Sequence, residues 1–505
     1  MTGDFLLACL KTTKGKRTKM VNKPNLMYYF NPFRAVALFS FLLLIVSDAL
    51  AQVKMPSIFT DGMVLQQQAK VPLWGWAGKG KNVSVKCSWN GENYQAKADK
   101  DGKWKVFVNT PKAGGPYSIK ISDGQTLTLN DVLIGEVWIL GGQSNMEMPM
   151  KGFRSQPVYG SNDAILHSKN PNIRLYVVPR AREFEAKENS KPSVWKHAEP
   201  EAVANFSATG YYFGRLLQDL LQVPIGLINV NYGGSTAEAW MSREELAAFA
   251  DIKLPEQKDA AKVDNRTPTA LYNGMLHPII GYGIKGAVFY QGESNYDRPD
   301  QYQKLFPALV KEWRSEWKQG DFPFYYVQIA PYNYAQLPPY QSGGKFNSAY
   351  LRDAQRKALD AIPNAGMVSL LDIGDEKSIH PMHKKPVGER LALLALGKTY
   401  GMKGFGYESP LLDTMEVTGS IAKIKFKNVH NGLSTFGHDL VNFEICGKDR
   451  WFYPAKAEID GNEVLVSSPK VKEPVAVRYA FKDFVVGELF STERLPVSSF
   501  RTDDF

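Results

Sequence analysis

Three apolar stretches in the middle of the chain each run into a glycine-containing turn, and this pattern constrains the fold more than any other feature. Val137–Leu140, Leu227–Val230 and Ala287–Tyr290 have the composition of buried β-strands. Helical stretches separate them, and strands that alternate with helices predict a largely parallel sheet covered on both faces. The carboxyl ends of parallel strands meet at one edge of a sheet, where ligands bind. We therefore expect the three turns to converge in space.

The same alternation continues through residues 131–403. Two further strands are expected at Phe324–Ile329 and Met367–Leu371. The expected helices are Tyr211–Leu221, Gln301–Lys318, Asn347–Leu359 and Val387–Tyr400. Residues 151–200 and 241–270 are polar and are expected to be irregular surface excursions that shape a pocket. The central region is therefore predicted to be an α/β domain.

The two flanking regions have a different pattern. Residues 53–130 and 404–505 contain short alternating runs, and in the first region Asn-Gly and Asp-Gly turns separate them. Short strands at regular spacing with turn signals predict small antiparallel sandwiches. Their role is left open between a binding module and a structural cap.

Residues 1–51 have the pattern of a targeting leader. Ala35–Val46 is an apolar run preceded by Arg34, and Ala49-Leu50-Ala51 supplies the small residues of a cleavage site. The run is too short to span a bilayer comfortably. We expect export to the periplasm or the extracellular space, with no stable membrane span after cleavage.

Composition excludes several classes of function. The net charge is +10, but the leader holds seven Lys and Arg against two Asp and Glu, so the remaining chain is only modestly basic and nucleic-acid binding is not predicted. Cys87 and Cys446 follow the leader, and two cysteines make no disulfide framework, although one bridge between them stays open. No Cys-x-x-Cys or His-Glu-x-x-His spacing occurs, so neither a metal nor a cofactor is expected.

The first turn, Gly141-Gly-Gln-Ser-Asn145, presents the hydroxyl of Ser144 at a strand end. A lone serine in a turn is more often a helix cap than a nucleophile. Here two further turns are expected beside it, which favours a nucleophile. Met146 stands where the Gly-x-Ser-x-Gly elbow requires glycine, and this argues against an α/β-hydrolase fold.

A serine nucleophile also needs a base and donors for an oxyanion. The backbone N–H groups of Ser144 and of Gly233 or Gly234 are candidate donors, and the side-chain amide of Gln291 or Asn295 could add another. The candidate base is His380, which follows the last expected strand and precedes a proline. His277, also followed by proline, and His383 are the alternatives.

These motifs occur in a recognisable order. They are Gly135–Glu147, Asn231–Trp240, Leu271–Met275, Tyr290–Asn295 and Ile379–Pro381, with Asp61–Gln66, Gly114–Tyr117 and Ser499–Asp503 near the ends. From residue 55 to residue 500 the chain resembles the sialate O-acetylesterase family of the SGNH (GDSL-type) hydrolase superfamily. The resemblance implies a three-layer hydrolase domain at 131–403 that removes O-acetyl groups from sialic acid or a related sugar without a cofactor. It also implies Ser144 as nucleophile, Gly233 or Gly234 as oxyanion donor and His380 as base.

One position departs from the superfamily, which usually places an aspartate three residues before the histidine. Lys377 occupies that position, and the nearest carboxylates are Asp375 and Glu376. Either a backbone carbonyl orients His380, giving a Ser–His dyad, or Asp375 reaches it through a different turn. An uncharged acceptor on the far ring nitrogen can fix the tautomer, and the dyad is the favoured interpretation.

Four other residues have competing interpretations. Glu293 is a second general base or, more often for such a residue, the partner of an arginine such as Arg314. Arg352 is a surface charge or a contact to a sugar carboxylate. Trp240 stacks on a sugar or packs against the helix behind it, and Gln143 contacts substrate or is structural. At the level of function, deacetylation of xylan or pectin and non-catalytic glycan binding are the rival hypotheses.

Overall fold

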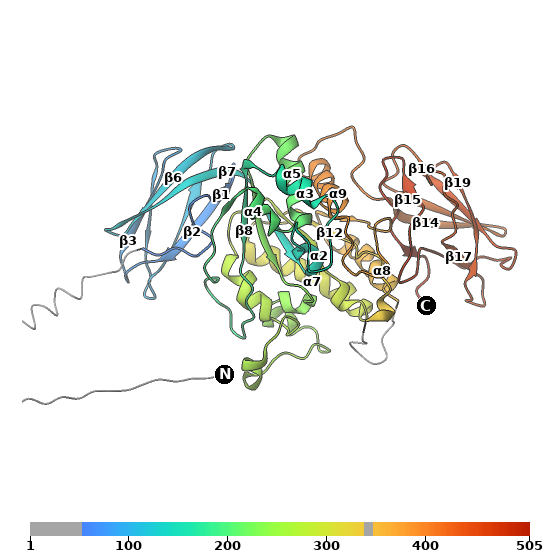
Figure 1. Ribbon diagram of the computed structural model, residues 1–505. Helices are drawn as coiled ribbons and strands as arrows, with labels where there is room; N and C mark the ends of the chain where they lie inside the picture. Colours follow the sequence, from blue (N-terminus) through green and yellow to red (C-terminus); the bar gives the residue numbers. More distant parts are fainter. Residues whose placement is uncertain (1–52, 338–346) are drawn as a thin grey trace, which may run out of the picture. The chain divides into compact units, whose positions relative to one another are not determined.

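The computed structural model describes residues 53–337 and 347–505, so the predicted leader lies outside the described residues. A mostly parallel sheet forms its centre (Figure 1). Its order is β13 (Ala365–Val368), β12 (Phe324–Val327), β11 (Gly286–Tyr290), β7 (Thr126–Gly142), β10 (Ile225–Asn231), β8 (Asn170–Val177) and β9 (Lys196–Ala198). Neighbours from β13 to β8 pair in parallel, and β9 pairs antiparallel with β8. The predicted α/β class is confirmed. Each predicted strand of this region is present with its ends shifted by a few residues, except that β7 begins much earlier than expected, at Thr126.

Helices cover both faces of this sheet. They are α5 (Ala208–Leu221), α7 (Pro299–Trp317), α8 (Ala349–Ala358) and α9 (Lys384–Lys398). Successive residues of a strand point to opposite faces. Leu140 of β7 lies in one apolar core with side chains of α5 and α9, whereas its neighbour Ile139 lies in the other core with side chains of α7 and α8. The result is the predicted three-layer arrangement.

One expectation for this region is wrong. Residues 151–200 were expected to be irregular, yet β8 extends the sheet beyond β10, and Ile173 to Tyr176 are buried in it. The strand begins with Asn170-Pro-Asn, which has the composition of a turn, and only four of its residues are buried. Its apolar signal is therefore too short to stand out from the polar sequence around it.

The N-terminal region is an antiparallel β segment that shares a strand with the central sheet. Its members are β1 (Val64–Gln66), β2 (Lys70–Trp76), β3 (Asn82–Cys87), β4 (Asn93–Lys97), β5 (Lys103–Asn109) and β6 (Gly114–Ser122). The first half of β7 pairs with β6, and its second half pairs with β10 and β11. Position 131, the expected start of the α/β domain, lies inside β7. The two regions consequently share one apolar core, which includes both Val85 of β3 and Ile139 of β7.

The C-terminal region is a second antiparallel segment with an apolar core of its own. One sheet contains β14 (Leu411–Thr418), β15 (Ile421–Lys427), β20 (Glu463–Ser467) and β19 (Lys456–Asp460). Another contains β18 (Tyr453–Pro454), β17 (Phe443–Cys446), β21 (Ala476–Tyr479) and β23 (Phe500–Arg501). Ile424 of the first sheet and Tyr479 of the second lie in the same core, as in a sandwich.

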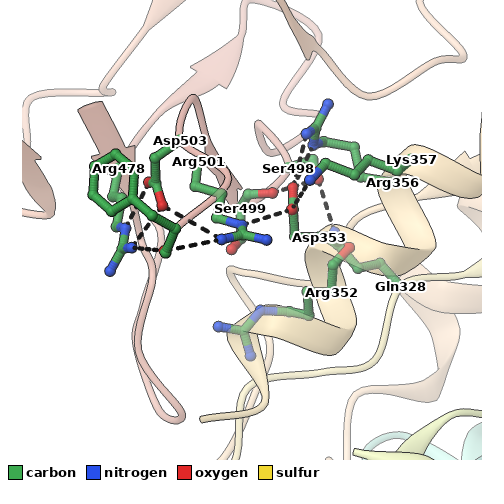
Figure 2. Close-up of polar contacts among 11 residues, drawn as sticks. Gln328, Arg352, Asp353, Arg356, Lys357, Arg478, Ser498, Ser499, Arg501 and Asp503 are labelled. Atoms are coloured by element: carbon green, nitrogen blue, oxygen red, sulfur yellow. Dashed lines mark hydrogen bonds and ion pairs between the residues drawn. The ribbon is translucent and has the colours of Figure 1, made fainter. Parts of the chain in front are cut away.

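A network of ion pairs joins the end of the chain to α8 (Figure 2). Asp353 of α8 accepts from Arg501 Nε of β23 at 3.1 Å, and it also pairs with Arg356 and Lys357 of its own helix. Asp503 pairs with Arg478 at 2.7 Å and with Arg501 at 3.4 Å. The closing Ser499–Asp503 motif therefore attaches the C-terminal segment to the α/β domain.

Two remaining observations concern cysteines and membranes. Cys87 and Cys446 are both buried and both free, so the open bridge between them is not formed. No helix within residues 53–337 and 347–505 combines the length and the apolar composition needed to cross a membrane.

Candidate active site

The three glycine-containing turns lie side by side, as predicted, because β11, β7 and β10 are neighbours in the sheet. The Gln143 N–H donates to Tyr290 O at 2.9 Å, and the Tyr232 N–H donates to Gly142 O at 3.1 Å. Gly142 has φ +135°, and a Cβ there would lie 2.1 Å from Tyr290 O. Only glycine permits this conformation and this approach, so the sequence of the first turn sets the spacing between the strand ends.

Ser144 is the first residue of a short helix, α2 (Ser144–Glu147), and is half-buried. A Cβ added to Gly233 would lie 3.4 Å from Ser144 Cβ, so the second turn contacts the candidate nucleophile. The first N–H groups of a helix have no partner within the helix. Neither the N–H nor the Oγ of Ser144 makes a hydrogen bond to any other described residue. Both groups are thus free to meet a substrate.

The His380 ring is oriented by a side chain that the sequence did not point to. Its Nδ1 lies 2.6 Å from Oε1 of Gln156, and the ring of Phe153 lies 5.3 Å away in an edge contact. An amide oxygen only accepts, so Nδ1 carries the proton and Nε2 presents a lone pair. Burial, and secondly the charge of Lys384, lower the pKa of His380 to about 4. The imidazole is therefore neutral at neutral pH, as a general base must be.

Neither of the two expected acceptors holds His380. The Asp375 carboxylate accepts the N–H groups of Lys377 at 2.8 Å and Ser378 at 3.0 Å, and it closes the turn before the histidine. No backbone carbonyl accepts from His380 Nδ1 either, because Gln156 Oε1 occupies that position. Gln156 and His380 are 224 residues apart in the chain, and a glutamine in a polar turn matches no catalytic motif. The one available signal was its position in the segment expected to shape a pocket.

Asn145 connects the segment that carries Ser144 to the segment that carries His380. Its Nδ2 donates to Ile379 O at 3.0 Å and to Glu293 Oε1 at 2.5 Å, and its Oδ1 accepts from Lys384 Nζ. The residue after the candidate nucleophile is thus bonded to the residue before the candidate base. Glu293 belongs to the third turn, so a single amide joins three of the converging segments.

Glu293 and Lys384 are both bonded to this amide, and their charges interact with each other. Both are almost fully buried, at 3% and 1% exposure. Burial raises the pKa of Glu293, while Asn145 and Lys384 oppose the rise. Burial lowers the pKa of Lys384 to about 7, and Glu293 opposes the fall. The expected pair between Glu293 and Arg314 is not formed, because Arg314 donates to Phe322 O at 2.8 Å.

The candidate oxyanion donors fall into two groups. The Gly233 N–H donates to Glu147 Oε2 at 2.8 Å and is therefore occupied. Gly234, at φ +73°, has an N–H that makes no hydrogen bond to another described residue. Gln291 donates to Ser235 O and Asn295 Oδ1, while Asn295 donates to Glu238 Oε2 at 3.0 Å. The last two amides are buried and hold the second and third turns together, which leaves Ser144 and Gly234 with available N–H groups.

The remaining candidates have structural contacts. Trp240 is fully buried, and its indole N–H donates to Ser235 Oγ at 2.9 Å, which matches the packing interpretation. Gln143 Oε1 accepts the N–H groups of Gly292 and Ser294, each at 3.3 Å. His277 Nδ1 lies 2.8 Å from Lys187 O, well apart from the three turns in its contacts.

Both interpretations of Arg352 are wrong. This side chain on α8 is fully buried, so it is neither a surface charge nor open to a sugar. It donates to Asp483 O, Ala480 O and Lys482 O of the C-terminal segment, and burial lowers its pKa to about 10. Its role is to attach that segment to α8.

A serine hydroxyl and a neutral imidazole at the carboxyl edge of a parallel sheet are the groups that serine hydrolases use. Within residues 53–337 and 347–505 no group of three or more His, Cys, Asp or Glu side chains is placed to hold a metal ion. The family of carbohydrate esterases described as sialic acid-specific acetylesterases matches residues 134–396. The chain belongs to this family and is a carbohydrate esterase.

Individual relatives agree with the family. Sialate O-acetylesterase of Homo sapiens is 31% identical, with 72% of this chain and 74% of the relative covered. Sialate O-acetylesterase of Pongo abelii is 29% identical, with 84% and 87% covered. A crystal structure of a carbohydrate acetylesterase from Xanthomonas citri is 35% identical and superposes with a TM-score of 0.81 over 90% of this chain and all of that one. The likeness extends over the flanking β segments as well as the α/β domain.

Proposed function

We propose that this chain is an exported enzyme that removes O-acetyl groups from sialic acid or a closely related sugar through an acetyl-enzyme on Ser144. The observation that carries the proposal is the hydrogen bond between His380 Nδ1 and Gln156 Oε1. This bond leaves Nε2 as the acceptor, and Asn145 holds the His380 segment beside Ser144. A neutral, oriented imidazole next to an unengaged serine hydroxyl is the arrangement that nucleophilic catalysis requires.

The proposed reaction has two halves. Ser144 Oγ attacks the ester carbonyl while His380 Nε2 takes its proton, and the N–H groups of Ser144 and Gly234 receive the oxyanion. The C–O bond to the sugar then breaks, and His380 returns the proton to the departing sugar oxygen. Water attacks the acetyl-enzyme with His380 again as base, which releases acetate and restores Ser144.

The choice of sugar is supported by the names of the relatives. Two sialate O-acetylesterases match most of the chain, and the structural relative is a carbohydrate acetylesterase. Release of acetate from O-acetylated sialic acid, acetylated xylan and acetylated pectin should be compared. Turnover confined to xylan or pectin would reject the sialate assignment and leave the esterase mechanism intact.

The decisive variant is Ser144→Ala. Purified wild-type protein should hydrolyse a chromogenic acetyl ester, and the variant should lose that activity while its circular dichroism and melting temperature stay unchanged. A folded Ser144→Ala protein with wild-type activity would contradict the proposed mechanism. Glycan binding by an inactive wild-type protein would favour the non-catalytic alternative.

Export rests on the leader pattern alone. Expression of the full chain, followed by N-terminal sequencing of the exported product, should find a mature chain that begins close to residue 52. A product that keeps residues 1–51 would contradict export by signal cleavage.

A further inference from the structure

A cavity of about 400 Å³ lies between the β2–β5 ribbon of the N-terminal segment and two segments of the α/β domain, at Glu188 and at His277. The residues that matter here are Trp74 and Trp76 with Asp99, Glu188 and His277. None of the residues assigned above to the active site lines this cavity. We infer that it is an accessory glycan subsite, which holds a sugar unit of the substrate chain at a distance from the ester that is cleaved.

The alternation of β2 directs two tryptophans into this cavity. Val71, Leu73 and Gly75 face the core, so Trp74 and Trp76 face the opposite side and both are only partly buried. On β5, Lys105 pairs with Trp74 and Lys103 pairs with Trp76 on the same face. Indole rings at partly exposed positions provide flat apolar surface for the C–H faces of a pyranose. Trp74 also packs edge-on against Phe59 of the core, with ring centroids 4.6 Å apart.

Each of three polar side chains at the cavity is held through one atom and keeps a second atom free to accept a hydrogen bond. Asp99 Oδ1 accepts the N–H groups of Asp101 and Lys103, which fixes the carboxylate and leaves Oδ2 without a described partner. Glu188 Oε1 pairs with Lys103 Nζ, and its Oε2 makes no hydrogen bond within the described chain. His277 Nδ1 is engaged by Lys187 O, so its Nε2 presents a lone pair. Sugar hydroxyls are donors that suit these atoms.

Trp104 also belongs to the lining, but its side chain lies on the core face of the ribbon, because it pairs with Gly75 and is 3% exposed. The surface offered to a ligand is therefore that of Trp74 and Trp76, together with the fixed acceptors. Partly exposed rings and fixed acceptors in a cavity of ordinary ligand size together match a carbohydrate.

The position of the cavity suits it to hold part of a polymeric substrate during catalysis. One wall comes from the N-terminal segment and the other from the α/β domain, and the Lys103–Glu188 ion pair connects the two walls. A subsite there would hold a glycan chain without contact to the acetyl group. It would therefore lower KM for polymeric substrates and leave the cleavage of small esters unchanged. This inference rests on the proposed esterase activity only for its kinetic readout.

The test compares Trp76→Ala and Trp76→Phe with a matched control, Trp451→Ala. Trp451 is 73% exposed in the C-terminal segment and does not line the cavity. Trp76→Ala should raise KM for acetylated xylan or O-acetylated mucin by about tenfold with kcat unchanged, as expected for loss of one aromatic anchor. Trp76→Phe should recover most of this loss, and Trp451→Ala should match wild type. All three should cleave a small chromogenic acetyl ester at the wild-type rate.

A binding measurement separates this inference from the proposed function. Xylohexaose, cellohexaose and sialyllactose carry no acetyl group and report on the cavity whether or not the protein is an esterase. At least one of them should quench tryptophan fluorescence saturably in wild type and in Trp451→Ala, but not in Trp76→Ala. Equal behaviour of the two alanine variants in both assays would overturn the subsite. Absence of hydrolysis of any acetyl ester would overturn the function and leave the binding result to stand.

Discussion

In the proposed mechanism, Gln156 takes the place behind His380 that serine hydrolases commonly give to a carboxylate. A carboxylate both orients the imidazole and stabilises the imidazolium that forms during the reaction. The amide of Gln156, 2.6 Å from Nδ1, supplies the orientation and a weaker, uncharged stabilisation. Asp375 is bonded to two backbone N–H groups of its own turn instead.

This difference predicts unequal effects of two alanine variants. Gln156→Ala should lower kcat for an acetyl ester by about 10²-fold, because the base loses its orientation. Asp375→Ala should lower kcat by less than about tenfold, because only the turn before His380 is loosened. Steady-state kinetics on both variants, with folding checked by circular dichroism, measure the contrast. A larger loss in Asp375→Ala would restore the aspartate as the third catalytic partner.

The charge of the buried Lys384 should influence the pH dependence of activity. Burial, with the positive charge of Lys384 as the second cause, lowers the pKa of His380 to about 4, so kcat/KM should fall on the acid side near that pH. Lys384→Met removes the charge, so the pKa of His380 should rise and the acid limb should move to higher pH. Lys385→Met is the matched control, since Lys385 is adjacent in sequence and pairs with Glu389 at the surface. An acid limb that stays in place in Lys384→Met would contradict this account.

Among the elements, α8 connects the candidate site to the end of the chain. Gln355 of α8 donates to Gln291 O at 3.0 Å and accepts the Ile329 N–H at 2.9 Å, so the helix supports the third turn. Two residues earlier on the same helix, Asp353 pairs with Arg501 (Figure 2). The C-terminal strand β23 is thereby linked to the sheet edge that carries the site.

Loss of this link should lower the free energy of unfolding by a measurable amount. Arg501→Met leaves Asp353 and Asp503 buried without one of their cations, and breaking a buried pair in this way costs about 3 kcal/mol. Urea unfolding of the variant should show a lower midpoint at an unchanged slope. Lys425→Met breaks an exposed pair with Glu416 and should leave the midpoint near wild type. Equal midpoints for the two variants would argue that the buried network is not stabilising.

At the scale of the whole molecule, β7 makes the N-terminal segment part of the catalytic fold. The strand pairs with β6 at one end and with β10 and β11 at the other. Gln66 Oε1 accepts the Val137 N–H, and the Tyr282 hydroxyl donates to Val64 O, so the first strand is bonded to both regions. Unfolding of one region removes packing from the other.

The shared core predicts cooperative unfolding of these two regions. Val85→Ala removes core volume in β3, far from the candidate site in sequence, and should destabilise the protein by about 2 kcal/mol. On heating, loss of esterase activity and loss of β-sheet signal should occur at the same, lowered midpoint. Activity that survives to the wild-type temperature while the β signal falls earlier would show that the N-terminal segment unfolds alone.

Local patterns in the sequence determined the elements and the convergence of the three turns. Strand hydrophobicity, helix alternation and the glycines at strand ends each involve only a few neighbouring residues, so they can be recognised in the sequence. Together they predict that Ser144 and His380 lie at one edge of the sheet. The tertiary structure alone decided what surrounds those two residues. Gln156 behind the imidazole, Lys384 beneath Asn145 and Arg352 against the C-terminal carbonyls all depend on contacts between distant segments. Polar side chains of this kind have several partners within reach in a linear sequence, and only packing selects one of them.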